Sequence, residues 1–215
     1  MGFILGFFHS IANTIKYPIC ILFILAFLLF IFLTFSPVFG ASPDKNSRVI
    51  IEGSENFVTG KFLNLKSNYT NTASLSDSSD KGSTLMSWIF PAEDKNPIAS
   101  LPTIQFHGNT LTEGKFVWLG HSTLLINTTG LIVMTDPVFN RASPVPIFGK
   151  PFAYENPTNI DDLPKVNAVI ISHDHYDHLD STAIKDLSKI VDRFFVPLGV
   201  KAHLERGGVD ADKIS

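Results

Sequence analysis

The stretch VNAVIISHDHYDHLD, residues 166–180, constrains the fold of this chain more than any other segment. Its first half is continuously apolar, which is typical of a strand that is buried on both faces of a sheet. Its second half places three histidines and three aspartates in nine positions, directly after that strand. Because α/β proteins bind ligands beyond the carboxyl ends of their strands, the sequence predicts an α/β fold with a functional site at this edge.

The segments on either side of this motif agree with an α/β layer arrangement. β-Branched and aromatic residues at 116–119, 123–126 and 131–135, with the turn sequence NTTG between the last two, predict a strand and a β-hairpin. Asp180 is placed to cap a helix of about a dozen residues after the motif. RFFVPL predicts another strand and GVKAHLER a short helix. Strands that alternate with helices are the pattern of α/β proteins.

An apolar segment near the N-terminus, YPICILFILAFLLFIFLTFSPVFG (17–40), is long enough to span a bilayer. Residues 19–35 carry no charge, and about 20 helical residues cross a hydrocarbon layer of ~30 Å. We expect one transmembrane helix at about 18–39 and a single-pass membrane protein. The alternative is export after cleavage of a signal peptide, because Gly40 and Ala41 could form a cleavage site. The flanking charges do not determine the orientation.

Charge and cysteine content exclude nucleic-acid partners and thiolate metal sites. The chain has 17 Lys and Arg against 20 Asp and Glu, without a basic run, so the electrostatic footprint of a nucleic-acid-binding protein is missing. Its single cysteine, Cys20, cannot form an internal disulfide or a Cys-x-x-Cys zinc site. Any metal must therefore be bound by histidine and aspartate.

Composition divides the chain into three predicted regions. A membrane anchor at 1–40 precedes an irregular region at 41–115, and a partial α/β domain follows at 116–215. Within the irregular region, SNYTNTASLSDSSDKGS (67–83) is rich in Ser, Thr, Asn and Asp and predicts a solvated loop.

The histidines and aspartates of the motif have the spacing of a metal site. His173 and His175 are two residues apart on backbone that leaves a strand, so both side chains can project to one side and bind one ion. Asp177 and His178 follow a turn and could bind a second ion. Imidazole and carboxylate without thiolate suit zinc, with iron or manganese as alternatives. Two ions about 3.5–4 Å apart can share a hydroxide and lower its pKa enough to make it a nucleophile.

SHDHYDHLD resembles the H-x-H-x-D-H signature of the metallo-β-lactamase superfamily. WLGHSTLLI, TDPVFNRASP, DLP and FFVPLG, in this order, resemble the branch that contains N-acylphosphatidylethanolamine-hydrolysing phospholipase D. The similarity covers 116–215, with a weaker match at TGKFLNL (59–65). It implies the N-terminal half of an αββα sandwich, preceded here by one transmembrane helix, and a centre that holds two zinc ions in the full-length protein.

The resemblance also implies roles for individual residues. His173 and His175 would bind the first zinc, and Asp177 and His178 the second. Asp177 would be catalytic as well, because it would handle the proton of the attacking hydroxide. Asp136, in TDP, resembles the family's aspartate that orients a histidine near the metal loop, although such a residue also occurs in simple turns at strand ends.

Three further histidines have less specific settings. His121, in LGHST, is expected either near the site, in a supporting position behind the metal ligands, or as an ordinary turn histidine. His107 and His203 are expected to be structural or surface residues.

The second half of the superfamily sandwich supplies at least one more histidine and an aspartate that bridges the ions, and no matching residues follow His178. The one later histidine, His203, lies in a predicted helix. Four ligands cannot fill two zinc sites, since each catalytic zinc takes about three protein ligands. The chain is therefore expected to be a truncated form of the enzyme, with a sheet face left for a missing C-terminal half or an oligomer partner.

Three functions stay open at this stage. The first is a membrane-anchored, zinc-dependent phosphodiesterase of the phospholipase D type that acts on N-acylated membrane phospholipids. The second is a lactonase of the same fold that hydrolyses a small-molecule ester. The third is a non-catalytic, membrane-anchored fragment that binds a metal weakly or a partner through its exposed sheet. The motif itself does not separate the three.

Overall fold

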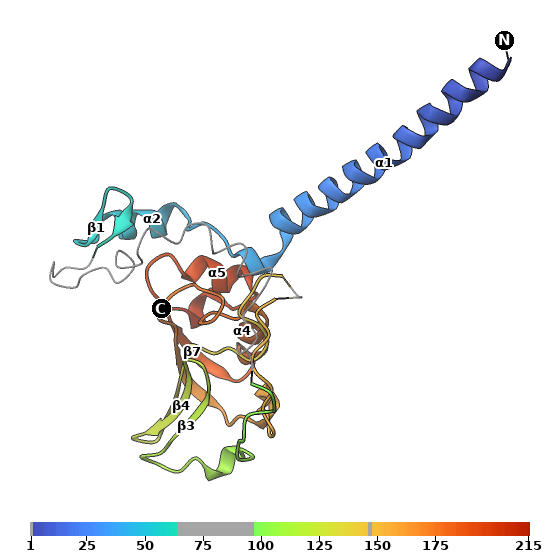
Figure 1. Cartoon of the computed structure of the whole chain (residues 1–215). Coiled ribbons are helices and arrows are strands. Elements are labelled where there is room, and N and C mark those ends of the chain that lie inside the picture. The colour runs from blue at the N-terminus through green and yellow to red at the C-terminus, as the bar shows by residue number, and fades with distance from the viewer. Residues whose placement is uncertain (1, 64–96, 146–147) are drawn as a thin grey trace, which may run out of the picture.

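The computed structural model describes residues 2–63, 97–145 and 148–215, so the predicted loop at 67–83 lies outside the described residues. One long helix projects from a small α/β body (Figure 1). The elements are, in chain order, α1 (Gly2–Phe35), η1 (Pro37–Phe39), α2 (Lys45–Glu52), β1 (Phe57–Val58), β2 (Lys61–Phe62), η5 (Gly108–Thr110), β3 (Phe116–Gly120), β4 (Thr123–Thr128), β5 (Leu131–Thr135), η6 (Ile160–Asp162), β6 (Val166–Ile170), α4 (Ser181–Leu187), β7 (Val191–Phe195), α5 (Lys201–Arg206) and η7 (Ala211–Lys213).

Helix α1 contains the apolar segment found in the sequence. Its part Lys16–Phe35 has a mean hydropathy of 2.9, is not buried against the rest of the protein, and is long enough to cross a bilayer. A signal sequence would pass the same test of length and composition. The helix ends at Phe35, ahead of the predicted limit of about 39, because Pro37 cannot continue the hydrogen-bonding pattern.

Strands β3 to β7 form one sheet in the order β3-β4-β5-β6-β7. The first three strands are antiparallel, whereas β5, β6 and β7 are parallel to one another. The predicted hairpin is confirmed: β4 and β5 are joined by Thr129 and Gly130, whose φ values of 50° and 77° are typical of a tight primed turn. The α/β prediction is confirmed as well.

The helix after the motif is shorter than predicted. Helix α4 has seven residues and ends at Leu187, and β7 already begins at Val191. The apolar residues Ile190 and Val191 fit a helical spacing, but Val191 pairs with Val166 in the parallel sheet instead. β-Branched side chains favour the pleated strand over the helix, and this preference decides the boundary.

In the described part of the chain, the helices cover one face of the sheet. A row of paired residues, Leu125, Met134, Val169 and Phe194, crosses four strands and is fully buried against Ile184 and Leu187 of α4 and Leu204 of α5. Each such side chain contributes about 1.5–3 kcal/mol of hydrophobic stabilisation. Figure 1 shows α4 and α5 on the same side of the sheet.

The opposite face carries the next row of the same register. Trp118, Leu124, Thr135, Ile170 and Phe195 are paired across all five strands. Trp118, Ile170 and Phe195 are 65%, 46% and 44% exposed. We call this row the open sheet row.

The segment that leaves α1 is attached to α5. Ala41 donates its backbone N–H to Nδ1 of His203 over 2.9 Å, and Arg206 donates to the carbonyl oxygen of Thr34 over 2.6 Å. Gly40 makes this approach possible, since a Cβ at this position would collide with the His203 ring. The end of α1 is therefore held next to the loop that follows β6.

Candidate metal centre

The motif residues lie at the edge of the sheet where the parallel strands end. The loop 171–180 follows β6, and Asp136 comes directly after β5, its parallel neighbour. His121 lies in the turn between β3 and β4, at the same edge. Three separate segments therefore converge on one place, as the motif's position after a buried strand predicts.

Four imidazole rings gather there. The ring centroids of His173 and His175 are 4.6 Å apart, those of His173 and His178 4.0 Å, and those of His121 and His178 5.3 Å. Protonated imidazoles at these distances would repel one another. Neutral imidazoles that share a cation would not, so the arrangement favours metal binding.

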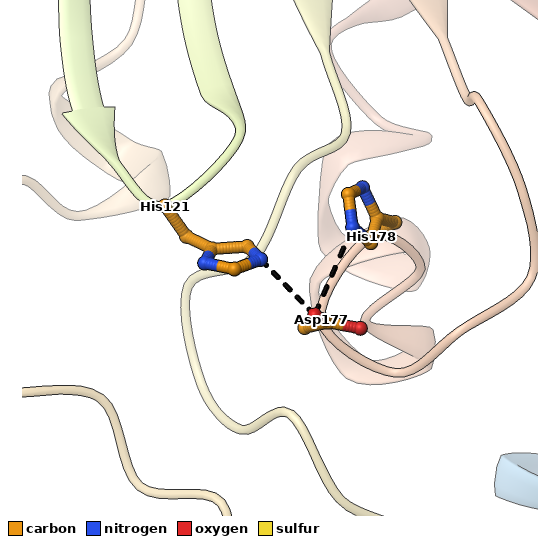
Figure 2. A group of neighbouring side chains, drawn as sticks. All are labelled: His121, Asp177 and His178. Atoms are coloured by element: carbon orange, nitrogen blue, oxygen red, sulfur yellow. Dashed lines mark hydrogen bonds and ion pairs between the residues drawn. The ribbon is translucent and has the colours of Figure 1, made fainter. Parts of the chain in front are cut away.

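Asp177 adds a carboxylate to this group. Its Oδ2 lies 3.1 Å from Nε2 of His121 and 3.7 Å from Nε2 of His178 (Figure 2). Partial burial raises the pKa of the Asp177 carboxyl, but its backbone hydrogen bond and the charges of His178 and His121 outweigh this and hold the pKa below its usual value. Asp177 is therefore ionised at neutral pH, as a metal ligand or proton acceptor must be.

Asp136 orients the ring of His178. Its Oδ1 accepts the backbone N–H of Ser172 over 2.7 Å, and its Oδ2 lies 3.1 Å from Nδ1 of His178. Because Nδ1–H donates a hydrogen bond to the buried carboxylate, the Nε2 lone pair of His178 is left for a metal. Asp136 has a φ of 38°, in a region that non-glycine residues rarely occupy, so the loop holds it in a strained conformation.

Ser172 does the same for His173. Its hydroxyl donates to Oδ2 of Asp136 over 2.9 Å, and its oxygen lies 2.9 Å from Nδ1 of His173. Since the hydroxyl proton goes to Asp136, the oxygen accepts from Nδ1 of His173 and leaves Nε2 free. Two motif histidines thus present the same ring nitrogen.

Residues 132–214 match a family model described as the beta-lactamase superfamily domain. The matched part of the chain is therefore similar to this superfamily domain. It includes nearly all of β5, the motif loop and both helices that cover the sheet, and it contains Asp136 and the motif histidines and aspartates.

Similar proteins occur in bacteria, animals and archaea. An uncharacterized protein of Mycobacterium tuberculosis is 36% identical over 173 residues, which are 78% of this chain and 45% of that protein. The N-acyl-phosphatidylethanolamine-hydrolyzing phospholipase D 1 of Caenorhabditis elegans is 36% identical over 120 residues, 54% of this chain and 33% of that protein. A metal-dependent hydrolase of Sulfurisphaera tokodaii is 37% identical over 75 residues, which are 34% of this chain and 27% of that protein. The chain spans less than half the length of each of these relatives.

The donors of the superfamily domain and of the neighbouring turn fit a zinc ion. One donor atom each from His121, Asp177 and His178 lies within 4.8 Å of the other two. Two nitrogens bound to one zinc at about 2.1 Å are at most about 4.2 Å apart, so small side-chain rotations would bring these donors into range. Zinc is bound by neutral imidazole and by ionised carboxylate, and this group supplies both kinds of side chain.

The structure gathers the residues predicted from sequence at one edge, but not all in the predicted grouping. His173 and His175 are neighbours, as are Asp177 and His178. His121, for which two settings were open, lies beside Asp177 and as close as a ligand would. The sequence pattern assigns no role to Ser172. Its position directly before His173 is nevertheless where a residue that orients this ring would stand.

Among the histidines whose side chains the structure describes, His107 and His203 lie outside this group. His107 is exposed in the loop before η5. His203 lies on α5, where its Nδ1 accepts from Ala41 and its Nε2 is 3.4 Å from Asp174. Because both nitrogens of His203 face protein groups, this residue supports the motif loop from behind.

Cavities open on two sides of the centre. One of about 290 Å³ lies between η1 and the motif loop and is lined by Phe39, Tyr176, His175 and Asp177 among others. A second, of about 530 Å³, is lined by Trp118, His121, Phe152 and Asp177. Both have apolar walls with a few polar groups, which is the usual character of a small-molecule site.

Proposed function

We propose that this protein is a zinc-dependent hydrolase, and specifically a phosphodiesterase of the phospholipase D type that acts on N-acylated phospholipids. The observation that carries this proposal is the gathering of His121, His173, His175 and His178 around Asp177, with Asp136 orienting a ring. The printed name of the nematode relative supports the substrate class.

The residues of this centre would have different roles: binding the metal, transferring a proton and orienting a ligand. His173 and His175 would hold one ion through imidazole, and Asp177, His178 and His121 a second. A bound zinc supplies an acidified water and a positive charge for the anionic transition state. Ionised Asp177 is placed to take the proton of the attacking water and to return it to the leaving oxygen. Asp136 keeps the His178 ring in the required orientation.

Helix α1 supports a lipid substrate. We propose that it is retained as a single-pass anchor, with export after signal-peptide cleavage as the alternative. Anchoring would keep the centre close to lipid headgroups and raise their effective concentration. Intact-mass measurement of the purified protein separates the two, since cleavage after Gly40 would remove all of α1.

We further propose that the sheet of this chain is one of the two sheets of an αββα sandwich. The exposed open sheet row supports this, because a second layer could bury it. That layer would come from a C-terminal half or from an oligomer partner.

A lactonase of the same fold is the second candidate. The cavity of about 290 Å³ beside His175 and Asp177 has the volume of a small cyclic ester. If the substrate is an N-acylated phospholipid, its acyl chains must lie outside this cavity, along the apolar wall or in the bilayer.

Zinc binding of the full chain in nanodiscs is the first test. Metal-free protein is titrated against a chelating indicator, and we expect the variant His173→Ala/His175→Ala to lose tight zinc binding. His107→Ala is the matched control, because it removes an exposed histidine outside the centre. Equal zinc affinity in all three proteins would overturn the assignment of the centre and favour a non-catalytic, membrane-anchored protein.

Turnover is the second test. Nanodiscs that contain N-acylphosphatidylethanolamine are compared with a soluble lactone, in the presence of zinc and after its removal with a chelator. Release of the N-acylated alcohol that depends on zinc supports the phosphodiesterase. Turnover of the lactone alone would replace the proposal by the lactonase.

A further inference from the structure

A third cavity, of about 780 Å³, lies between the end of α1, the 140–144 loop and α4. Phe32 and Ser36 line it from the side of α1, and Tyr176 lines it from the motif loop. Figure 1 shows that the base of α1 lies next to α4 and α5. This cavity is separate from the donor group of the metal centre, which lines the cavities on the other sides of the loop.

The cavity is positively charged. Three basic residues line it, Arg141, Lys185 and Arg206. Its one acidic residue, Asp180, is buried and accepts hydrogen bonds from the backbone N–H groups of residues 139, 140, 182 and 183. Because these donors occupy the carboxylate, its charge does little to neutralise the basic side chains across the cavity.

Two of the three cations have no ionic partner within the described part of the chain. The lysine and arginine residues described there form ion pairs as Lys165–Asp192, Lys189–Asp186 and Lys201–Glu205, which do not include Arg141 or Lys185. Arg206 is occupied, since it donates to the carbonyl oxygen of Thr34 at the end of α1. The guanidinium of Arg141 and the ammonium of Lys185 are therefore available to an external anion.

The depth of the cavity along α1 indicates the source of that anion. Phe32 is three residues from the end of the apolar part Lys16–Phe35, which is about 4.5 Å of helix. If α1 spans a bilayer, Phe32 lies at the boundary between acyl chains and headgroups, where phosphate groups lie. Basic side chains at this level are attracted to anionic lipids by about 1 kcal/mol each.

We propose that this cavity binds the phosphate of an anionic phospholipid from the leaflet into which α1 is inserted. Arg141 and Lys185 contact the phosphate, and Phe32 contacts the lipid's glycerol and upper acyl chain. Tyr176 lies between two ligands of the metal centre, so a bound lipid rests on the segment that carries them. This inference rests on the proposed function only in that α1 is taken to lie in a bilayer. It requires neither metal nor hydrolysis.

The test measures which lipids stay bound to the full chain. Metal-free protein is placed in nanodiscs of phosphatidylcholine with a minority of phosphatidylglycerol, released into mild detergent and examined by native mass spectrometry. We expect adducts enriched in phosphatidylglycerol for the natural protein. The variant Arg141→Gln/Lys185→Gln should retain about 30-fold less, because two cations are removed.

Lys115→Gln/Lys165→Gln is the matched control. It removes the same charge from residues that precede β3 and β6, at the edge of the sheet opposite the motif loop. Equal retention of the two lipids by the natural protein, or the same loss in both double variants, would overturn the proposal. Displacement of the adduct by millimolar inorganic phosphate would also overturn it, because the site would then recognise free phosphate.

The outcome is independent of the proposed hydrolase. A protein that binds no zinc and hydrolyses no ester can still retain phosphatidylglycerol, and a fully active one can fail to do so. If the chain does not enter nanodiscs, the membrane part of the proposed function and this inference both fail.

Discussion

At the scale of single residues, hydrogen bonds to Nδ1 set the ring orientation of two histidines of the candidate metal centre. Asp136 and Ser172 bind the Nδ1 atoms of His178 and His173, so Nε2 of each ring is left without these partners, and that of His178 lies 3.7 Å from Asp177. The sequence placed the candidate ligands at a strand end, as the structure does, but the orientation of each ring depends on contacts that only the folded chain makes. Only the structure shows these contacts.

The carboxylate of Asp136 should tune zinc affinity without touching the ion. Asp136→Asn keeps the shape of the side chain, but when its amide oxygen accepts from Ser172, its amide nitrogen cannot accept a hydrogen bond from Nδ1 of His178. We expect zinc affinity to fall by about 10- to 100-fold, measured by competition with a chelating indicator. Asp186→Asn, an exposed position on α4, is the control. Unchanged affinity in Asp136→Asn would show that the ring needs no such partner.

The buried side chain of Asp180 should contribute strongly to stability. It caps α4 through Thr182 and Ala183 and also accepts from Phe139 and Asn140, so it joins two segments. Asp180→Ala leaves these donors unpaired, and we expect a loss of about 2–4 kcal/mol in the free energy of unfolding. The fall in Tm should be about 4 °C or more, followed by tryptophan fluorescence. Asp186→Ala, on the same helix but exposed, should change Tm little; equal shifts would contradict the capping role.

At the scale of elements, local patterns predicted the kind of each segment better than its end. The β4–β5 hairpin is set by its turn sequence, and β6 by its apolar run, so both could be found without tertiary information. The boundary between α4 and β7 could not be found from the sequence alone. Ile190 and Val191 satisfy either period, and the pairing of Val191 with Val166 decides between them.

The attachment of the α1 exit segment to α5 could not be predicted either, because it joins residues about 160 positions apart. Gly40→Ala tests it. Gly40 has a φ of 64° and its Cβ would meet the ring of His203, whereas Gly60 has a φ of 81° and open space around it. Both substitutions strain the backbone by about 1 kcal/mol, but only Gly40→Ala should separate the two segments.

Limited proteolysis of the full chain in nanodiscs measures this separation. We expect cleavage within residues 36–44 to become several-fold faster in Gly40→Ala than in Gly60→Ala. The same cleavage rate in the two variants would mean that the contact with His203 does not hold the segment.

At the scale of the whole molecule, the continuously apolar run of β6 predicted a strand that is buried on both faces of the sheet. This prediction is wrong in the structure, because Ile170 is 46% exposed, and the register shows what the exposed face carries. The two rows that cross the strands differ by one residue in each strand. One row packs against α4 and α5, and the other, the open sheet row, leaves Ile170 and Phe195 about half exposed. Apart from Thr135, both rows are apolar, so the sequence of the strands alone could not show which face the helices cover.

An exposed apolar row of this kind should promote self-association of the protein. Ile170→Thr/Phe195→Thr keeps strand propensity through a β-branched side chain and removes apolar surface. We expect a larger monomer fraction at a given protein concentration in sedimentation experiments, with one chain per micelle as the monomer. Val58→Thr/Phe62→Thr is the matched control, because these residues are 45% and 46% exposed in the β1–β2 hairpin, outside the five-stranded sheet. An equal rise in monomer for both pairs would attribute association to general hydrophobicity. A rise for the sheet pair alone would identify the open sheet row as the surface that a second layer of protein covers.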